Sequence, residues 1–266
     1  MDSMKASRLL AQDYSATAPE YAALWGPVIL PMALPLLASL PLEQASRVLD
    51  AGTGVGGLIR YLRLHAPSAL IYGVDYSEGM VRRGIRTETF PGAVMDAQHL
   101  GIRSGVMDVI VMAFMLFHLP QPLRGLAEAK RVLKSEGWIG LTTWSRDPGL
   151  PGAALWSEEL DRLGAVADPR DPIVRQHELV DSPEKISQLL GDAGFRSIET
   201  WRESFEHAWD PESLLLLQYS LGVAGRRLAT LSAQAQADCV DRVRERMARL
   251  EELVWRPEVL FSIAQT

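Results

Sequence analysis

The sequence predicts an α/β fold built on a doubly wound, mostly parallel sheet. Short apolar runs alternate with helical patterns between residues 46 and 144, and this alternation is typical of a parallel sheet covered by helices on both faces. A glycine-rich turn, Gly52–Gly57, follows the first run, and an acid ends each of the first three. Ligands bind at the carboxyl ends of strands in such sheets, so the same residues indicate a small-molecule site.

The first half of the chain carries the repeating pattern. The run at 108–113 is apolar throughout, as expected for a parallel strand buried on both faces. Ser77 is placed to cap the helix that follows the second run. Strands are expected at 46–50, 69–74, 93–95, 108–113 and 138–144, and helices at 58–64, 77–85 and 123–133.

The second half departs from simple alternation. A proline-rich segment at 145–180 reads as loop and short helix. Helices between the last two strands have no place in a minimal doubly wound unit, so we expect an inserted helical lid at about 145–180 and 210–255. Residues 1–45 are expected to form a helical cap on a domain of 46–266. Helices are expected at 182–193, 211–221 and 230–253, and strands at 197–207 and 258–264.

Composition excludes several classes of function. The chain has 266 residues, and its net charge of -6 gives no general basic field for a nucleic-acid backbone. Its one cysteine provides neither a disulfide framework nor a thiolate zinc site. We therefore expect a cytoplasmic protein that binds no nucleic acid and no metal.

One N-terminal stretch is unusually apolar. No charged residue occurs between Glu20 and Glu43, a length that would admit a membrane span. Four prolines interrupt the stretch, and no cluster of Lys or Arg sets an orientation. We expect a buried helix over the core and no membrane span. An alternative is that the stretch lines an apolar pocket or forms a contact between copies in a homo-oligomer.

The glycine turn fits two ligand-binding patterns. Gly52, Gly54 and Gly57 match the dinucleotide fingerprint GxGxxG. Asp50 with Gly52, Gly54 and Gly56 matches the DxGxGxG pattern of S-adenosylmethionine sites. In both, glycine allows positive φ and lets the backbone approach a ligand closely. A turn without a ligand is the third interpretation.

The acids at the strand ends favour an adenosyl ligand. Asp75 ends the second strand, where a carboxylate can accept hydrogen bonds from both ribose hydroxyls. Asp96 ends the third strand, where it can accept from the adenine amine while Ala97 donates its N–H to a ring nitrogen. Asp50 and the glycine turn would take the amino-acid end. This set fits S-adenosylmethionine better than NAD, and an acid at Asp75 disfavours NADP.

The motifs at these positions resemble the class I S-adenosylmethionine-dependent methyltransferases, in particular the small-molecule type 11 branch. The resemblance covers residues 46–144 in family order and is looser over 182–266. It implies a Rossmann-like sheet of seven strands whose last strand is antiparallel. The motifs are VLDAGTGVGG (48–57), GVDYSEGM (73–80), MDAQHL (95–100), MDVIVMAFMLFHL (107–119) and AEAKRVLKSEGW (127–138).

The resemblance also implies the residues that hold the cofactor, S-adenosylmethionine, and its product, S-adenosylhomocysteine. They are Tyr21, Asp50, Gly52, Thr53, Gly54, Asp75, Tyr76, Met80, Asp96, Ala97, Gln98, Met112 and Ala113.

Catalysis and the acceptor are less constrained. The family often has two adjacent histidines after the fourth strand, whereas this chain has Phe117 followed by His118. His118 is the candidate general base, because imidazole titrates in the useful range; the alternative is that it only shapes the pocket. The expected acceptor pocket consists of Tyr14, Trp25, Phe114, Met115, Trp144, His177, His207 and Trp209.

The sequence therefore predicts an enzyme of class EC 2.1.1 that methylates a small aromatic or lipophilic molecule in natural-product biosynthesis. Seven tryptophans without a basic field support an apolar acceptor. An NAD-dependent oxidoreductase and a non-catalytic subunit that binds an adenosyl ligand are the alternatives.

Overall fold

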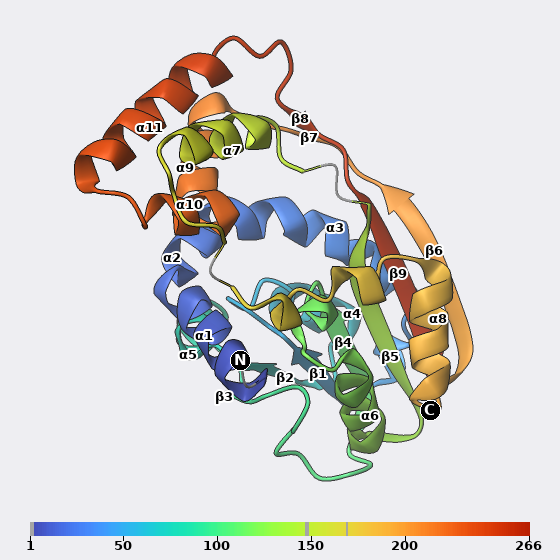
Figure 1. The fold of residues 1–266 in the computed structure, drawn as a ribbon. Helices are drawn as coiled ribbons and strands as arrows, with labels where there is room; N and C mark the ends of the chain where they lie inside the picture. The colour runs from blue at the N-terminus through green and yellow to red at the C-terminus, as the bar shows by residue number, and fades with distance from the viewer. Residues whose placement is uncertain (1–2, 147–148, 169) are drawn as a thin grey trace.

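A seven-stranded mixed sheet forms the centre of the molecule (Figure 1). The computed structural model describes residues 3–146, 149–168 and 170–266. The strand order is β3-β2-β1-β4-β5-β9-β6. The first five strands in this order pair in parallel, and β9 is antiparallel to both β5 and β6. The strands are β1 (Arg47–Ala51), β2 (Leu70–Asp75), β3 (Gly92–Val94), β4 (Met107–Ala113), β5 (Leu133–Arg146), β6 (Arg196–Ser204) and β9 (Glu258–Gln265).

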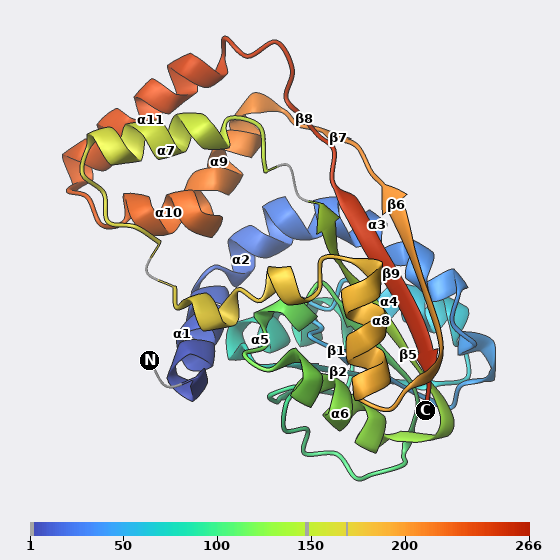
Figure 2. The ribbon, with the colours of Figure 1, turned by 45° about the vertical axis from the view of Figure 1, so that its right-hand side comes forward.

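The predicted fold class is confirmed, including the antiparallel last strand. Helices cover both faces of the sheet: Figure 2 shows α6 and α8 on one face and α3 and α4 on the other. Ser77 caps α5 as expected, because its side chain accepts a hydrogen bond from the Met80 N–H. The helices around the sheet are α3 (Gly26–Ala38), α4 (Ile59–His65), α5 (Glu78–Glu88), α6 (Pro122–Val132) and α8 (Pro183–Asp192).

Four further helices gather beyond the carboxyl end of β5, away from the sheet (Figures 1 and 2). They are α7 (Ala153–Arg162), α9 (Pro211–Ser220), α10 (Gly222–Leu228) and α11 (Ala233–Met247). Residues 147, 148 and 169 of the predicted lid lie outside the described residues. The division into a cap of 1–45 and a domain of 46–266 stays a prediction.

Two predicted elements in this half had wrong bounds. The helix expected at 230–253 spans only Ala233–Met247. Ser232 sets its start, because the Ser232 side chain caps the helix by accepting a hydrogen bond from the Ala235 N–H. The strand expected at 197–207 ends at Ser204, and a separate short strand β7 (His207–Ala208) pairs with β8 (Val254–Trp255). Helix α10 was not predicted. Leu221 is extended and Gly222 has a φ of 74°, which separates α10 from α9.

The N-terminal segment is helical from its first described residue. Helix α1 (Ser3–Ala16) is followed by α2 (Ala18–Glu20), a π-helical turn η1 (Tyr21–Trp25) and α3. Among the described residues, one helical stretch, 18–38, is long and apolar enough to cross a membrane by its length and composition alone. In the fold, six residues of α3 are buried.

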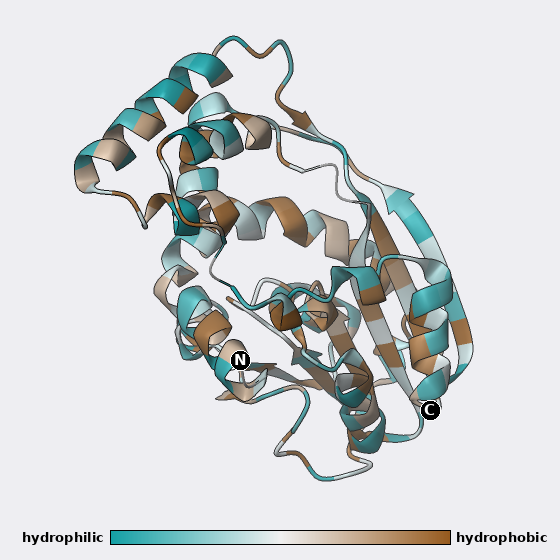
Figure 3. Cartoon of the chain, viewed as in Figure 1, coloured by the Kyte–Doolittle hydropathy of each residue, from teal (hydrophilic) through white to brown (hydrophobic). Residues whose placement is uncertain are grey.

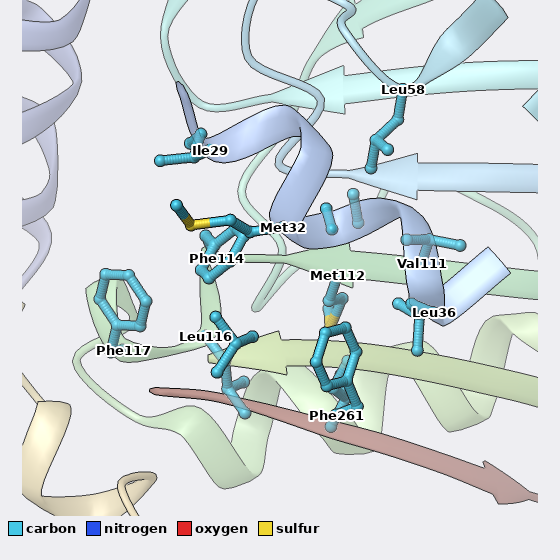
Figure 4. Packing of buried hydrophobic residues seen from close by; sticks show 14 of the residues in the cluster. Ile29, Met32, Leu36, Leu58, Val111, Met112, Phe114, Leu116, Phe117 and Phe261 are labelled. Atoms are coloured by element: carbon cyan, nitrogen blue, oxygen red, sulfur yellow. The ribbon is translucent and has the colours of Figure 1, made fainter. Parts of the chain in front are cut away.

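Helix α3 packs closely on β5. Figure 4 shows Met32 and Leu36 pointing from α3 toward the sheet. A Cβ atom on Gly140 of β5 would lie 2.7 Å from Leu40 Cδ1 and 3.2 Å from Leu36. Only a glycine leaves room for this approach. The colouring of Figure 3 places the apolar residues of α3 and of the central strands in the same region.

We expect Leu36→Ala to lower the free energy of unfolding by about 2–5 kcal/mol, because Leu36 is fully buried and the change leaves a cavity. Denaturant titration measures the loss. Leu64→Ala is the matched control, since Leu64 is 74% exposed on α4. Equal losses in the two variants would contradict the packing described here.

Candidate active site

A cavity opens at the carboxyl ends of β1, β2 and β4, with α1 as one wall. Its lining contains most of the residues predicted for the cofactor and catalysis, and three of those predicted for the acceptor pocket, Tyr14, Phe114 and Met115. Those predicted residues are Tyr14, Tyr21, Gly52, Gly54, Asp75, Tyr76, Met80, Asp96, Ala97, Gln98, Ala113, Phe114, Met115 and His118.

The glycine turn presents bare backbone to this cavity. Gly52 and Gly54 have φ values of 82° and 53°, which residues other than glycine rarely adopt. A Cβ atom on Gly54 would meet nothing within 4 Å, so it would project into open space. A Cβ atom on Gly52 would lie 2.7 Å from Met115. The turn therefore lets a ligand approach the backbone.

Asp75 holds the turn and remains able to bind a ligand. Its Oδ2 accepts the Gly54 N–H at 2.9 Å, and its Oδ1 accepts the Ser77 N–H at 2.8 Å. Burial raises the pKa of Asp75, although these backbone N–H groups partly oppose the shift. Each carboxylate oxygen can accept a second hydrogen bond. The Asp75 carboxylate is therefore suited to accept hydrogen bonds from two hydroxyl groups of a ligand.

Asp50 lies behind the turn and does not line the cavity. It is 1% exposed and accepts the Thr53 hydroxyl at 2.7 Å. Burial raises the pKa of Asp50 to about 7 against the opposing Thr53 hydrogen bond. Thr53 and Met112 are also buried and lie outside the cavity lining. Within the described structure, these three residues support the site without facing it.

The segment after β3 forms another wall. Asp96 Oδ1 accepts the Gln98 N–H at 2.8 Å. Gln98 Oε1 in turn accepts the Gln121 N–H at 3.1 Å, at the start of α6. These bonds fix Asp96 and Ala97 at the cavity, where a half-buried acid beside a backbone N–H can recognise a purine edge.

The chain turns sharply after β4. Phe114 has a φ of 52°, which is an outlier for a bulky residue and is found mostly at functional sites. Its N–H donates to the Thr142 carbonyl at 2.9 Å. This turn directs Met115 and His118 to the cavity.

His118 and Tyr14 form the polar pair at this end of the cavity. Tyr14 Oη lies 3.0 Å from His118 Nε2. Burial, together with the nearby His177 and Arg170, lowers the pKa of His118 to about 3. Burial raises the pKa of the Tyr14 phenol. Both groups are therefore neutral at physiological pH.

Helix α1 is fastened over the cofactor end of the cavity. Ser15 Oγ lies 2.8 Å from Ser77 Oγ and accepts the Gly79 N–H at 3.1 Å. A Cβ atom on Gly79 would lie 2.5 Å from the Ser15 carbonyl oxygen. The close contact between α1 and the start of α5 thus makes α1 a fixed wall.

Sequence reasoning missed most of this wall. Ser7, Leu10 and Ala11 line the cavity with Tyr14. Their spacing of three, four and seven residues places them on one face of a helix. That pattern was present in the sequence within the helical cap expected at 1–45, but Ser7, Leu10 and Ala11 were not predicted to belong to the site.

The remaining predicted pocket residues do not line the cavity in the described structure. An aromatic cluster behind Phe114 contains Trp25, Trp144 and Trp209. The rings of Phe114 and Trp144 stack with their centroids 4.3 Å apart. The rings of Trp25 and Trp209 also stack, with their centroids 6.4 Å apart. The cluster also contains His207, whose ring is 4.5 Å from that of Trp209, and Trp255, 5.3 Å from Trp25. His177 stacks on Phe117 at 4.1 Å.

Residues 49–141 match the family model described as methyltransferase domain. This match supports the class I S-adenosylmethionine-dependent methyltransferases as the family of this domain. S-adenosylmethionine is therefore its cofactor, and S-adenosylhomocysteine is the product. This family membership decides between the two ligand interpretations of the glycine turn. The bare backbone at Gly54 and the open acceptor positions of Asp75 fit this cofactor.

Known methyltransferases resemble this chain in sequence and fold. It is 34% identical to a malonyl-[acyl-carrier protein] O-methyltransferase of Geobacter sulfurreducens over 164 residues, which are 60% of this chain and 59% of that protein. It is 27% identical over 182 residues to the ubiquinone/menaquinone biosynthesis C-methyltransferase UbiE of Ralstonia pickettii, covering 61% and 72% of the two chains. Thus this chain spans less than two thirds of the first of these relatives.

A solved structure shares the fold. Phosphoethanolamine N-methyltransferase 2 of Haemonchus contortus, in complex with phosphomonomethylethanolamine and S-adenosylhomocysteine, superposes with a TM-score of 0.53. The match covers 89% of this chain and 52% of that one at 18% identity. At that identity the likeness concerns the fold.

We expect the stability of the cofactor-free protein to depend on pH through Asp50. Its pKa is about 7 in the folded chain and about 4 in the unfolded one, so ionisation favours unfolding as pH rises through this window. As the pH rises from 5 to 7, the melting temperature of the wild type should fall relative to the melting temperature of Asp50→Asn. Asp108→Asn is the control, because the pKa of Asp108 is lowered and its effect should be constant over that range. Parallel curves for wild type and Asp50→Asn would contradict the assignment.

Proposed function

We propose that this chain transfers a methyl group from S-adenosylmethionine to a small acceptor with an aromatic or lipophilic body. The observation that carries the proposal is that one cavity contains both the cofactor-binding residues and the Tyr14–His118 pair. Near this pair the lining is apolar, with Leu10, Phe114 and Leu119. The large group of helices beyond the sheet supports a natural-product scaffold as acceptor.

Bound S-adenosylmethionine supplies an activated methyl group, so the protein chiefly positions the acceptor and excludes water. Helix α1 closes the cavity through the Ser15 contacts. Asp75 and Gly54 hold the cofactor in place.

The Tyr14–His118 pair would orient the acceptor and share its proton. The Tyr14 oxygen accepts a hydrogen bond from the acceptor while its own proton is donated to His118 Nε2. Because the pKa of His118 is about 3, the imidazole would hold this proton only during transfer and would release it to water when the products leave. An acceptor that loses a proton on methylation would benefit from this arrangement.

The proposal is tested by incubating the purified chain with S-adenosylmethionine and a panel of phenols, amines and quinols. Formation of S-adenosylhomocysteine together with a methylated product supports it. Binding of the cofactor without turnover on the panel would favour a non-catalytic adenosyl-binding subunit.

We expect Asp75→Ala to weaken S-adenosylmethionine binding by about 10- to 100-fold, the loss expected when hydrogen bonds to a charged acceptor are removed. Isothermal titration calorimetry measures the affinity. The control is Asp192→Ala, which changes an exposed residue at the end of α8. This variant should bind S-adenosylmethionine with the wild-type affinity. Unchanged affinity in Asp75→Ala would remove Asp75 from the cofactor site.

We expect His118→Ala to lower kcat by about 100-fold or more at saturating acceptor, a typical contribution of general acid–base catalysis. The affinity for the cofactor should change little, because Asp75 and the glycine turn are intact. Tyr14→Phe should share the defect, since it removes the hydroxyl that bonds to His118. If His118→Ala turns over at the wild-type rate, the residue only shapes the pocket.

A further inference from the structure

Phe114 forms the wall between the cavity and the aromatic cluster behind it. The residue lines the cavity together with Met115 and His118. Its ring also stacks on Trp144, with the centroids 4.3 Å apart and the ring planes at 27°. Trp144 is not part of the cavity lining in the described structure. Because Phe114 is only 9% exposed, its side chain fills the space between the cavity and the first tryptophan.

Behind this wall the aromatic rings continue as a chain. The ring of Trp144 lies 5.4 Å from that of Trp255, which lies 5.3 Å from that of Trp25. Trp25 in turn stacks on Trp209. Trp25 and Trp144 are only half-buried, so the cluster is less tightly enclosed than the core. Aromatic side chains of this kind suit a flat apolar group, and Phe114 is the residue that separates them from the cavity.

The backbone at Phe114 is strained and is held in place from two sides. Its φ of 52° is unfavourable for a bulky residue and open to glycine. The Phe114 N–H donates to the Thr142 carbonyl at 2.9 Å and to the Thr142 Oγ1 at 3.2 Å. On the next residue, Met115 lies so near the glycine turn that a Cβ atom on Gly52 would be 2.7 Å from it. A phenylalanine kept at a position that favours glycine indicates a role for the ring itself.

We propose that Phe114 determines the size of the acceptor, by excluding molecules whose apolar body would extend to Trp144. Its ring occupies the place that such a body would need. Phe114 is then a specificity-determining residue and takes no part in proton transfer, which the Tyr14–His118 pair performs. This inference rests on the proposed function, since it concerns the acceptor of the same cavity.

The test uses two phenols on the protein saturated with S-adenosylhomocysteine. 4-Methylphenol and 4-benzylphenol differ by a phenyl group, the group that Phe114→Ala removes. An apolar cavity left by such a substitution can bind an aromatic ring. Calorimetry measures both affinities in the wild type and in the variant.

We expect the wild type to bind 4-methylphenol more tightly than 4-benzylphenol. Phe114→Ala should shift the ratio of the two affinities toward 4-benzylphenol by about 10-fold or more, the gain expected from burying one phenyl group. A ratio that stays unchanged in Phe114→Ala, or tighter binding of 4-benzylphenol by the wild type, would overturn the proposal.

Two further variants separate the ring from the backbone. Phe114→Gly removes the ring and relieves the positive φ, so it should show the same shift as Phe114→Ala. Phe114→Leu keeps part of the wall and should show a smaller shift. These variants also judge the proposal if Phe114→Ala does not fold, and wild-type ratios in both would contradict it.

Phe117→Ala is the matched control. Phe117 is 4% exposed and stacks on His177, but it is absent from the cavity lining in the described structure. Figure 4 shows the rings of Phe114 and Phe117 apart on the segment that follows β4. The ratio in Phe117→Ala should match that of the wild type. An equal shift in both alanine variants would mean a general loosening of the fold and would contradict the role of Phe114.

The two proposals can fail separately. Titration with S-adenosylhomocysteine alone comes first, and absence of binding would overturn the proposed function. The comparison of the two phenols on the cofactor-free chain then still judges the wall, because Phe114 stacks on Trp144 without any ligand. Normal cofactor binding with an unchanged ratio would overturn only the role of Phe114.

Discussion

The site depends on the close approach of a bare backbone turn to the end of a neighbouring strand. Gly52 and Gly54 adopt positive φ, and the Gly54 N–H donates to Asp75 at the end of β2. This one bond fixes both the bare backbone surface of the turn and the carboxylate that we propose binds the cofactor. Asp50 supports the turn from behind through Thr53. A side chain at Gly54 would project into the cavity, so the turn works only because it is made of glycine.

Burial determines the chemistry at the other end of the cavity. Away from water, the imidazole of His118 and the phenol of Tyr14 stay neutral, and their hydrogen bond joins α1 to the turn after β4. The cavity thus has two acids, Asp75 and Asp96, toward one end and a neutral polar pair at the other.

The sequence predicted the sheet well because its signals are local. The continuous apolar run of β4, the glycine turn and the cap at Ser77 each follow from a few neighbouring residues. Prediction failed where distant segments decide the structure. The helix expected at 230–253 is shorter than its composition suggests, and the face of α1 that lines the cavity was not predicted beyond Tyr14. The tryptophans expected to line the pocket instead pack on one another behind Phe114. Composition cannot distinguish a pocket wall from the layer behind it.

The sequence by itself indicated the family and the cofactor, because the glycines and acids occur at fixed spacings along successive strands, and the residues expected to hold that cofactor stay a prediction. Only the tertiary structure decided how the acceptor end is built. Tyr14 and His118 are 104 residues apart in the chain, and Arg226 meets Asp168 across 58. Contacts over such separations leave no periodic pattern in a single sequence. They arise when α1 packs on the turn after β4, and α10 on the segment after α7.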